Sequence, residues 1–437
     1  MAKYAFPERL RLKKADSMYN KTCLKNGVRI ISEKSEHVQS VSMGIWIGTG
    51  SRDEDTALSG ISHFIEHMVF KGTKRRSGIQ IAKEFDAIGG LSNAFTGKEY
   101  TCYHARVLRK HFDVCTDLLG DIVLNPTFNP VDLERERQVV LQEISMVEDT
   151  PDDMIQELLT RSFWPGHPLG LSVLGSDETV SGIDREVLLR HMGCAYVPGT
   201  ILVTAAGNIH HNELVERFAP LFEPLEPGEH LPPRCNPEPH GEMSCHEKDL
   251  EQVHICIGGC APSQKDDSRF ACSIFNTILG GNMSSRLFQE VRENRGLAYS
   301  VFSFVASYQD AGLLGVYAAT DPGQVNELLS TVKAEIQKVC DGELTSSDVE
   351  AAREYLIGSM HLSEESPDHL MSRLAKNEFL FGHPVSCKEV ESRLLQVDVD
   401  EVVEAAYHAF LRQPVSLVTL GPFTRSELDD DHLVFGT

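Results

Sequence analysis

The sequence predicts an α+β fold of two related halves, each a mostly antiparallel sheet with helices packed on it. A chain of 437 residues is longer than one hydrophobic core usually organises. A proline-rich stretch at 224–244 divides it almost equally, and the same order of strands and helices can be read on either side. We therefore expect a first half at 1–223, a linker at 224–244 and a second half at 245–437.

The linker is predicted from its proline content. Proline fixes φ and has no backbone N–H, so neither a helix nor a strand is expected where prolines are this dense. The prolines and glycines of the stretch are Pro224, Pro227, Gly228, Pro232, Pro233, Pro237, Pro239 and Gly241.

The first half reads as two strands, two helices, a hairpin and two longer helices. The stretch 40–47 is a nearly continuous run of apolar and β-branched residues, which is typical of a buried strand. Gly97-Lys98 marks the turn of the hairpin, and Asn125-Pro126 separates the two longer helices. The expected strands are 27–33, 40–47, 91–96 and 100–107, and the expected helices are 58–70, 77–88, 109–124 and 130–149.

The second half repeats this order. Residues 253–258 correspond to the strand at 41–46, 268–279 to the helix around His63, and 315–319 to the strand around Tyr103. Asp348 then opens a helix as Asp132 does in the first half. Such a repeat predicts that both halves share one architecture.

Composition and charge favour a soluble, cytoplasmic protein. The chain has 41 Lys and Arg against 64 Asp and Glu, a net charge of −23, which argues against nucleic acid or an anionic membrane surface as partner. The longest uncharged stretch, 270–285, is interrupted by asparagine and glycine, and residues 1–16 lack the apolar core of a signal peptide. Eleven scattered cysteines indicate neither a disulfide framework nor a zinc ribbon, which fits a reducing compartment.

The segment His63-Phe64-Ile65-Glu66-His67 has the spacing of a metal site on a helix. His63 and His67 are four residues apart, so both rings leave one face and can reach one ion. Glu66 lies beside them and could take a proton from a water that zinc activates, in the reverse order of the commoner His-Glu-x-x-His motif. The alternative is a polar helix face with two solvated histidines, and with 18 histidines in the chain the motif alone does not decide.

A catalytic zinc needs a third protein ligand, and the helix expected at 130–149 offers two carboxylates. Glu136 and Glu143 are seven residues apart, two helical turns, and therefore share one face. Two carboxylates on one face could ligate the ion and orient a ligating imidazole.

On these residues the chain resembles the pitrilysin/insulinase family of zinc peptidases, most closely the processing-peptidase β-subunits and their bacterial homologues. In that family a glutamate ligand follows His-x-x-Glu-His near the end of a later helix, and here Glu143 follows His67 by 76 residues. The resemblance extends to the flanking residues 68–73. It implies one Zn²⁺ per chain held by His63, His67 and Glu143, with Glu66 as the general base and Glu136 as the carboxylate that supports a ligand.

The resemblance also implies where a peptide would bind. The segment 92–96 resembles the family's edge strand, which pairs with the substrate backbone, so Asn93, Ala94 and Phe95 are expected to contact the peptide. Asp153 and Glu157, at i and i+4, fall where the resembling β-subunits place acidic residues that receive a basic side chain. The alternatives are an ordinary hairpin strand and the solvated acidic start of a helix that begins at Pro151.

In the second half, the positions that correspond to the metal motif carry no metal ligands. The counterparts of the three motif residues fall near Phe275, Ile278 and Leu279, so this half is expected to be a degenerate repeat. It does carry Arg292 and Tyr299, seven residues apart, which match a pair that faces the zinc in the resembling family. The resemblance implies that Tyr299 donates to the oxyanion and that Arg292 holds the substrate; the alternative is a surface arginine and a packed tyrosine.

These residues predict a zinc metalloendopeptidase that hydrolyses unfolded peptides or presequence-like segments inside an enclosed chamber. A homodimer would form the chamber, and whether Arg292 and Tyr299 act in their own chain or in the partner is left open. The alternative is a non-catalytic core or scaffold subunit of the same fold. Such subunits usually lose motif residues, whereas all of them are present here.

Overall fold

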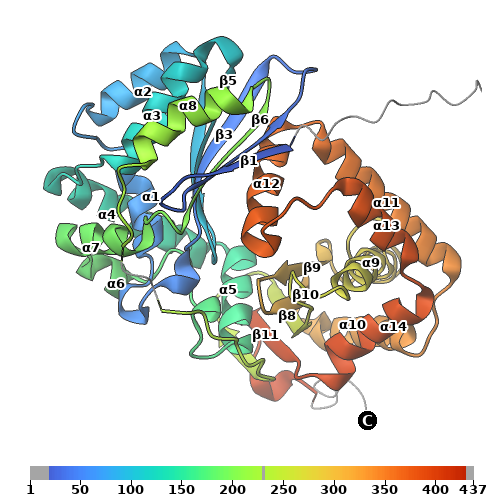
Figure 1. The fold of residues 1–437 in the computed structure, drawn as a ribbon. Coiled ribbons are helices and arrows are strands. Elements are labelled where there is room, and N and C mark those ends of the chain that lie inside the picture. The colour runs from blue at the N-terminus through green and yellow to red at the C-terminus, as the bar shows by residue number, and fades with distance from the viewer. Residues whose placement is uncertain (1–18, 229–231, 430–437) are drawn as a thin grey trace, which may run out of the picture.

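The computed structural model describes residues 19–228 and 232–429 and shows two α+β halves, each with its own sheet (Figure 1). The sheet of the first half has six strands in the order β1-β2-β6-β3-β5-β4, and that of the second has five in the order β7-β11-β8-β10-β9. The strands of the first sheet are β1 (Tyr19–Cys23), β2 (Arg29–Lys34), β3 (Ser40–Ile47), β4 (Leu91–Thr96), β5 (Thr101–Leu108) and β6 (Ile201–Gly207). Those of the second are β7 (Met243–Glu247), β8 (Val253–Cys260), β9 (Val301–Ser307), β10 (Gly312–Thr320) and β11 (Ser416–Gly421).

The two sheets have the same topology once β1 is set aside. Each contains a single parallel pair, β2 with β6 and β7 with β11, and every other neighbouring pair is antiparallel. The order β2-β6-β3-β5-β4 thus corresponds to β7-β11-β8-β10-β9, position by position. The expected fold of two related, mostly antiparallel halves is confirmed.

Each sheet buries one face against helices of its own half. The run of apolar residues in β3 is buried from Val41 to Ile47, as a strand covered on both faces requires. The helices of the first half are α1 (Ile61–Val69), α2 (Gly78–Ala87), α3 (Phe112–Leu124), α4 (Pro130–Asp149), α6 (Asp177–Gly182), α7 (Arg185–Ala195) and α8 (His211–Phe222). Those of the second half are α9 (Arg269–Leu279), α10 (Val325–Cys340), α11 (Ser346–Glu364), α13 (Cys387–Gln396) and α14 (Val399–Tyr407).

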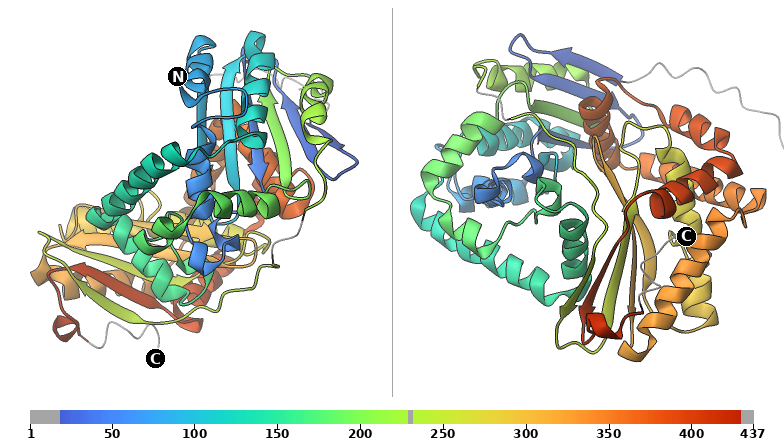
Figure 2. Two further views of the ribbon diagram at one scale, coloured as in Figure 1. Left: turned by 90° about the vertical axis from the view of Figure 1, so that its left-hand side faces the viewer. Right: turned by 90° about the horizontal axis from the view of Figure 1, so that it is seen from below.

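The other face of each sheet is covered by a helix from the opposite half. Helix α5 (Pro151–Phe163) follows α4 in the chain but packs on β8 and β11 of the second sheet. Helix α12 (Pro367–Phe381) follows α11 but packs on β2, β3 and β6 of the first sheet, beside which it lies in Figure 1. The division at residue 223 therefore separates the halves along the chain. In space, each half packs one helix against the sheet of the other (Figure 2).

The linker ends two residues earlier than expected. Residues 225–228 and 232–242 form no helix or strand, but β7 begins at Met243 and pairs in parallel with β11. The expected linker 224–244 is wrong for its last two residues, because β11 supplies a partner strand that the local sequence does not reveal.

The linker is held beside the junction of the two halves by contacts of two arginines. Arg234 pairs with Asp53 at 2.7 Å, and Arg52 donates to the carbonyl oxygen of Cys235 at 2.6 Å. Arg52 also reaches Asp310 of the second half at 2.6 Å and is itself buried. Buried arginine needs such carboxylate and carbonyl partners, so the contacts fix the linker against the junction of the halves.

Three expectations from composition concern membrane spans, cysteine pairing and a signal peptide. No helix within 19–228 and 232–429 is long and apolar enough to cross a membrane. All eleven cysteines are free thiols. The absence of a signal peptide was expected from residues 1–16, which lie outside the described residues.

Candidate metal centre

Helix α1 presents a polar face on an otherwise buried helix. Its apolar side chains pack into the core of the first half, which leaves His63, Glu66 and His67 on the side that faces α4 and β4. The buried apolar residues are Ile61, Phe64, Ile65, Met68 and Val69. Packing of the apolar face thus determines where the motif points.

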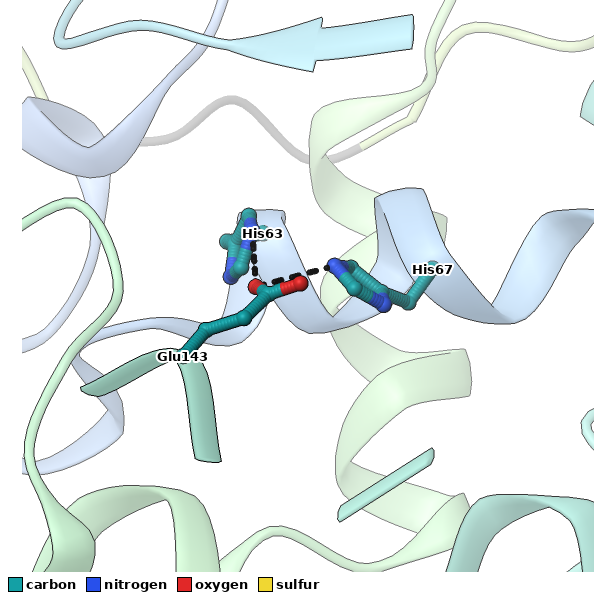
Figure 3. Close-up of side chains that lie close together, drawn as sticks. All are labelled: His63, His67 and Glu143. Carbon is teal, nitrogen blue, oxygen red and sulfur yellow. Dashed lines mark ion pairs between the residues drawn. The ribbon is translucent and has the colours of Figure 1, made fainter. Parts of the chain in front are cut away.

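Helix α4 brings Glu143 to the two histidines. The Nε2 atom of His63 lies 3.5 Å from Oε2 of Glu143, and Nε2 of His67 lies 3.4 Å from the same oxygen. Figure 3 shows both rings directed at this carboxylate. One donor atom from each residue lies within 4.8 Å of the others, and no other group of three or more His, Cys, Asp or Glu in the described ranges meets this condition.

The donor set fits a zinc ion. Zinc binds His nitrogen and carboxylate oxygen at about 2.0–2.2 Å, so tetrahedral ligand atoms lie roughly 3.4 Å apart, close to the separations found here. His63 is only 8% exposed, and burial, followed by the neighbouring His67, lowers the pKa of His63 to about 4. A neutral imidazole keeps the lone pair that a metal requires.

Glu136 supports one of the two histidines. Its Oε2 lies 3.3 Å from Nδ1 of His67, and its Oε1 pairs with Nζ of Lys71 at 2.7 Å. This contact leaves Nε2 of His67 directed at Glu143, as expected of a carboxylate that orients a ligating imidazole. The Nδ1 atom of His63, by contrast, is buried and has no hydrogen-bond partner.

Glu66 lies beside the donor set without belonging to it. Its carboxylate is half-buried and accepts a hydrogen bond of 2.6 Å from the hydroxyl of Thr96. Burial raises the pKa of Glu66. Sequence reasoning missed Thr96, because a threonine at the end of a strand carries no signal of which side chain it meets.

The segment expected to bind the peptide lies at the edge of the first sheet. Strand β4 pairs with β5 on one side and is the last strand of the sheet among the described residues, and it packs beside α1. Asn93 and Phe95 are exposed, and the side chain of Asn93 accepts a hydrogen bond from the N–H of Ala94. The free edge is the place where a peptide strand could add, although the contact itself stays a prediction.

The two acidic residues of α5 have different surroundings. The helix begins at Pro151, as the sequence suggested. Asp153 is exposed and has no side-chain partner in the described part of the chain, whereas Glu157 is half-buried and accepts a hydrogen bond of 2.6 Å from Ser172. The charge of Glu157 also acts on Lys98. Asp153 is therefore the freer of the two to meet a basic side chain.

Arg292 and Tyr299 lie together in the second half. The guanidinium of Arg292 is 4.6 Å from the ring centroid of Tyr299, and the tyrosine is 80% exposed. The alternative of a packed tyrosine is therefore wrong. Across the described ranges no hydrogen bond, ion pair or ring contact joins the pair to the donor set on α1 and α4.

Comparison with known proteins decides the family. Residues 29–177, which contain the donor set, match the family described as "Insulinase (Peptidase family M16)". The zinc protease YmxG of Bacillus subtilis is 40% identical over 391 residues, which are 89% of this chain and 95% of that protein. The chain belongs to the insulinase family. A zinc protease of Streptomyces coelicolor is 38% identical over 410 residues, 92% of this chain and 89% of that protein.

A second family match runs from the end of the first half into the second half. Residues 182–356 match the "Peptidase M16 inactive domain", and Phe275, Ile278 and Leu279, which stand where the first half has its motif, are buried in the core. A protease structure from Helicobacter pylori superposes with a TM-score of 0.87 at 22% identity, over 93% of this chain and 100% of that one. A structure described as a peptidase M16 inactive domain from Pseudomonas fluorescens has a TM-score of 0.86 at 20% identity, over 93% and 98%. These likenesses confirm the fold.

Proposed function

We propose that the chain is a zinc-dependent endopeptidase with one Zn²⁺ held by His63, His67 and Glu143. The convergence of the three donor atoms within 4.8 Å, with a separate carboxylate beside them, is the observation that carries this proposal. Bacterial relatives carry the name uncharacterized zinc protease, and these names support it. A scaffold subunit would not need this donor set.

Different residues of this chain serve different steps of peptide hydrolysis. When bound, zinc supplies a Lewis acid that polarises a carbonyl and lowers the pKa of a water to about 7. Glu66 accepts the proton of the attacking water and later gives it to the leaving amine, while the hydroxyl of Thr96 holds one of its oxygens in place. Tyr299 donates a hydrogen bond to the oxyanion, and Arg292 holds the peptide next to it.

The proposed substrate is an unfolded peptide or a presequence-like segment. Backbone pairing along the free edge of β4 would accept many sequences, and Asn93, Ala94 and Phe95 line that edge. Two copies of the chain would enclose the site in a chamber. Eleven free thiols and a net charge of −23 favour a cytoplasmic location without a nucleic-acid or membrane partner.

Mapping of cleavage sites on a mixed library of unstructured peptides tests the proposal. We expect cuts at internal bonds by the zinc-loaded protein, and none in a folded protein that contains one of the cleaved sequences, because a folded segment cannot pair with the edge strand. Release of terminal residues alone, or no cleavage of any peptide, would contradict an endopeptidase.

A preference for Arg or Lys near the scissile bond is expected from α5. Loss of a charge-assisted contact costs about 1.5–3 kcal/mol, or roughly ten- to a hundredfold in specificity. The ratio of kcat/KM for paired peptides that differ by Arg→Ala should therefore fall in Asp153→Asn/Glu157→Gln. Glu148→Gln, which removes a nearby exposed carboxylate, should leave the ratio unchanged. Equal ratios in wild type and the double variant would contradict the assignment.

Whether Arg292 and Tyr299 act in their own chain or in a partner is decided by mixing two inactive variants. Glu66→Gln chains keep Tyr299, and Tyr299→Phe chains keep Glu66. Action in the partner chain predicts that activity returns when the two are mixed, because the partner would restore one complete site in each mixed dimer. If mixed dimers form, as shown by exchange of differently labelled chains, and stay inactive, the pair acts within one chain.

A further inference from the structure

Helix α1 begins without a cap of its own. Its N-cap residue is Gly60, at φ 93°, which has no side chain to accept from the first amides of the helix. Glu54 takes this place from outside the helix. Its Oε2 accepts from the N–H of Gly60 and its Oε1 from the N–H of Ser62, each at 2.8 Å. One carboxylate thus holds the start of α1 with both oxygens, where the helix dipole favours a negative charge.

Glu54 is buried although burial of its charge is costly. It is 7% exposed, and burial raises the pKa of Glu54 to about 7 against the opposing effect of the two backbone contacts and of Lys98. Lys98 lies in the turn between β4 and β5 and donates to the carbonyl oxygen of Leu171. A buried carboxylate with two amide donors and a nearby cation fixes a geometry that an apolar residue could not.

The opposite side of the helix start is also fixed. A Cβ atom at Gly60 would lie 2.4 Å from the carbonyl oxygen of Leu174, and one at Gly175 would lie 2.3 Å from that of Ser59. Both glycines have positive φ, 93° and 79°, so the two backbones can approach only because neither carries a side chain. The first turn of α1 is therefore held between the Glu54 carboxylate and residues 174–175.

The position of the His63 ring depends on this first turn more than that of the His67 ring does. It is the third residue of α1, next to Ser62, and its Nδ1 has no hydrogen-bond partner that could orient the ring. His67 lies one turn further along and is held by Glu136. The place of the His63 ring relative to Glu143 is thus set by the backbone of the helix start.

We infer that Glu54 is a positioning residue of the metal site, because it caps α1 through Gly60 and Ser62 and so places His63 for joint binding with His67 and Glu143. The inference rests on the proposed zinc function and adds to it a residue that touches neither metal nor substrate. Loss of the cap should let the first turn fray, so that zinc binding would have to restore it.

The test is the dissociation constant of zinc, measured on the full chain by competition with a chromophoric chelator. Residues that orient metal ligands typically contribute about ten- to a hundredfold in metal affinity, and we expect a loss of this size in Glu54→Ala. Glu54→Gln should lose less, because its amide keeps one acceptor oxygen for one of the two N–H groups. The matched control is Glu378→Gln, which alters an equally buried carboxylate that pairs with Lys21 and Arg29 on the far face of the first sheet.

The control distinguishes an effect on the position of His63 from a general loss of protein stability. Glu378→Gln should lower the melting temperature without changing the affinity for zinc. The inference is overturned if Glu54→Ala binds zinc as tightly as wild type, or if Glu378→Gln weakens binding as much as Glu54→Gln does. Should Glu54→Ala fail to fold, Glu54→Gln decides by the same comparison. Failure of the unsubstituted chain to bind zinc would overturn the proposed function itself, and it would be seen before any variant is compared.

Discussion

Replacement of Glu66 by glutamine is expected to leave zinc bound and to lower kcat by roughly a hundred- to ten-thousandfold, the usual contribution of a positioned general base. Glu66 is not one of the three converging donors, so its loss removes no ligand. The amide of glutamine can still accept the hydrogen bond from Thr96, but it cannot take the proton of the attacking water.

Zinc content and kcat are measured on the same preparation of Glu66→Gln. The matched control is Glu134→Gln, which makes the same chemical change on α4 at an exposed residue that pairs with Arg137. The control should behave as wild type. Near-normal turnover in Glu66→Gln would show that another group serves as the base and that the assigned roles are wrong.

Removal of any one ligand is expected to abolish zinc binding and turnover together. His63→Ala, His67→Ala and Glu143→Gln each take away one of three donors, and two remaining donors do not hold zinc firmly. Glu136→Gln should have a smaller effect, about ten- to a hundredfold in affinity, because it disturbs only the orientation of His67.

The measurement is zinc stoichiometry after dialysis, together with kcat/KM on one peptide. We expect wild type to bind zinc most tightly, Glu136→Gln less tightly, and the three ligand variants least. A ligand variant that retains a full equivalent of zinc after dialysis would remove that residue from the donor set.

Much of the fold follows from local sequence. The strand expected at 40–47 is β3, because a run of apolar and β-branched residues is typical of a strand buried on both faces. The helix expected at 130–149 is α4, since Asn129 caps it and Pro130 suits its first position. Helical spacing puts His63 with His67, and Glu136 with Glu143, on one face of each helix. That Glu143 joins the two histidines is implied by the resemblance to the family.

Other features depend on contacts between distant segments and have no local signal. An amphipathic helix shows which face it buries but not against which sheet, so the exchange of α5 and α12 between the halves could not be predicted. The hydrogen bond from Thr96 to Glu66 and the cap that Glu54 provides also join residues through the tertiary fold. The N-cap residue of α1 is a glycine, so the local sequence does not show that the Glu54 carboxylate caps the helix instead.

The most direct test of a zinc endopeptidase is cleavage of one unstructured peptide by the full chain before and after its metal is removed and restored. We expect activity to disappear when a chelator strips the protein and to return in proportion to added zinc, with full activity at one zinc per chain. Undiminished cleavage by protein that contains no measurable metal would contradict the proposed function.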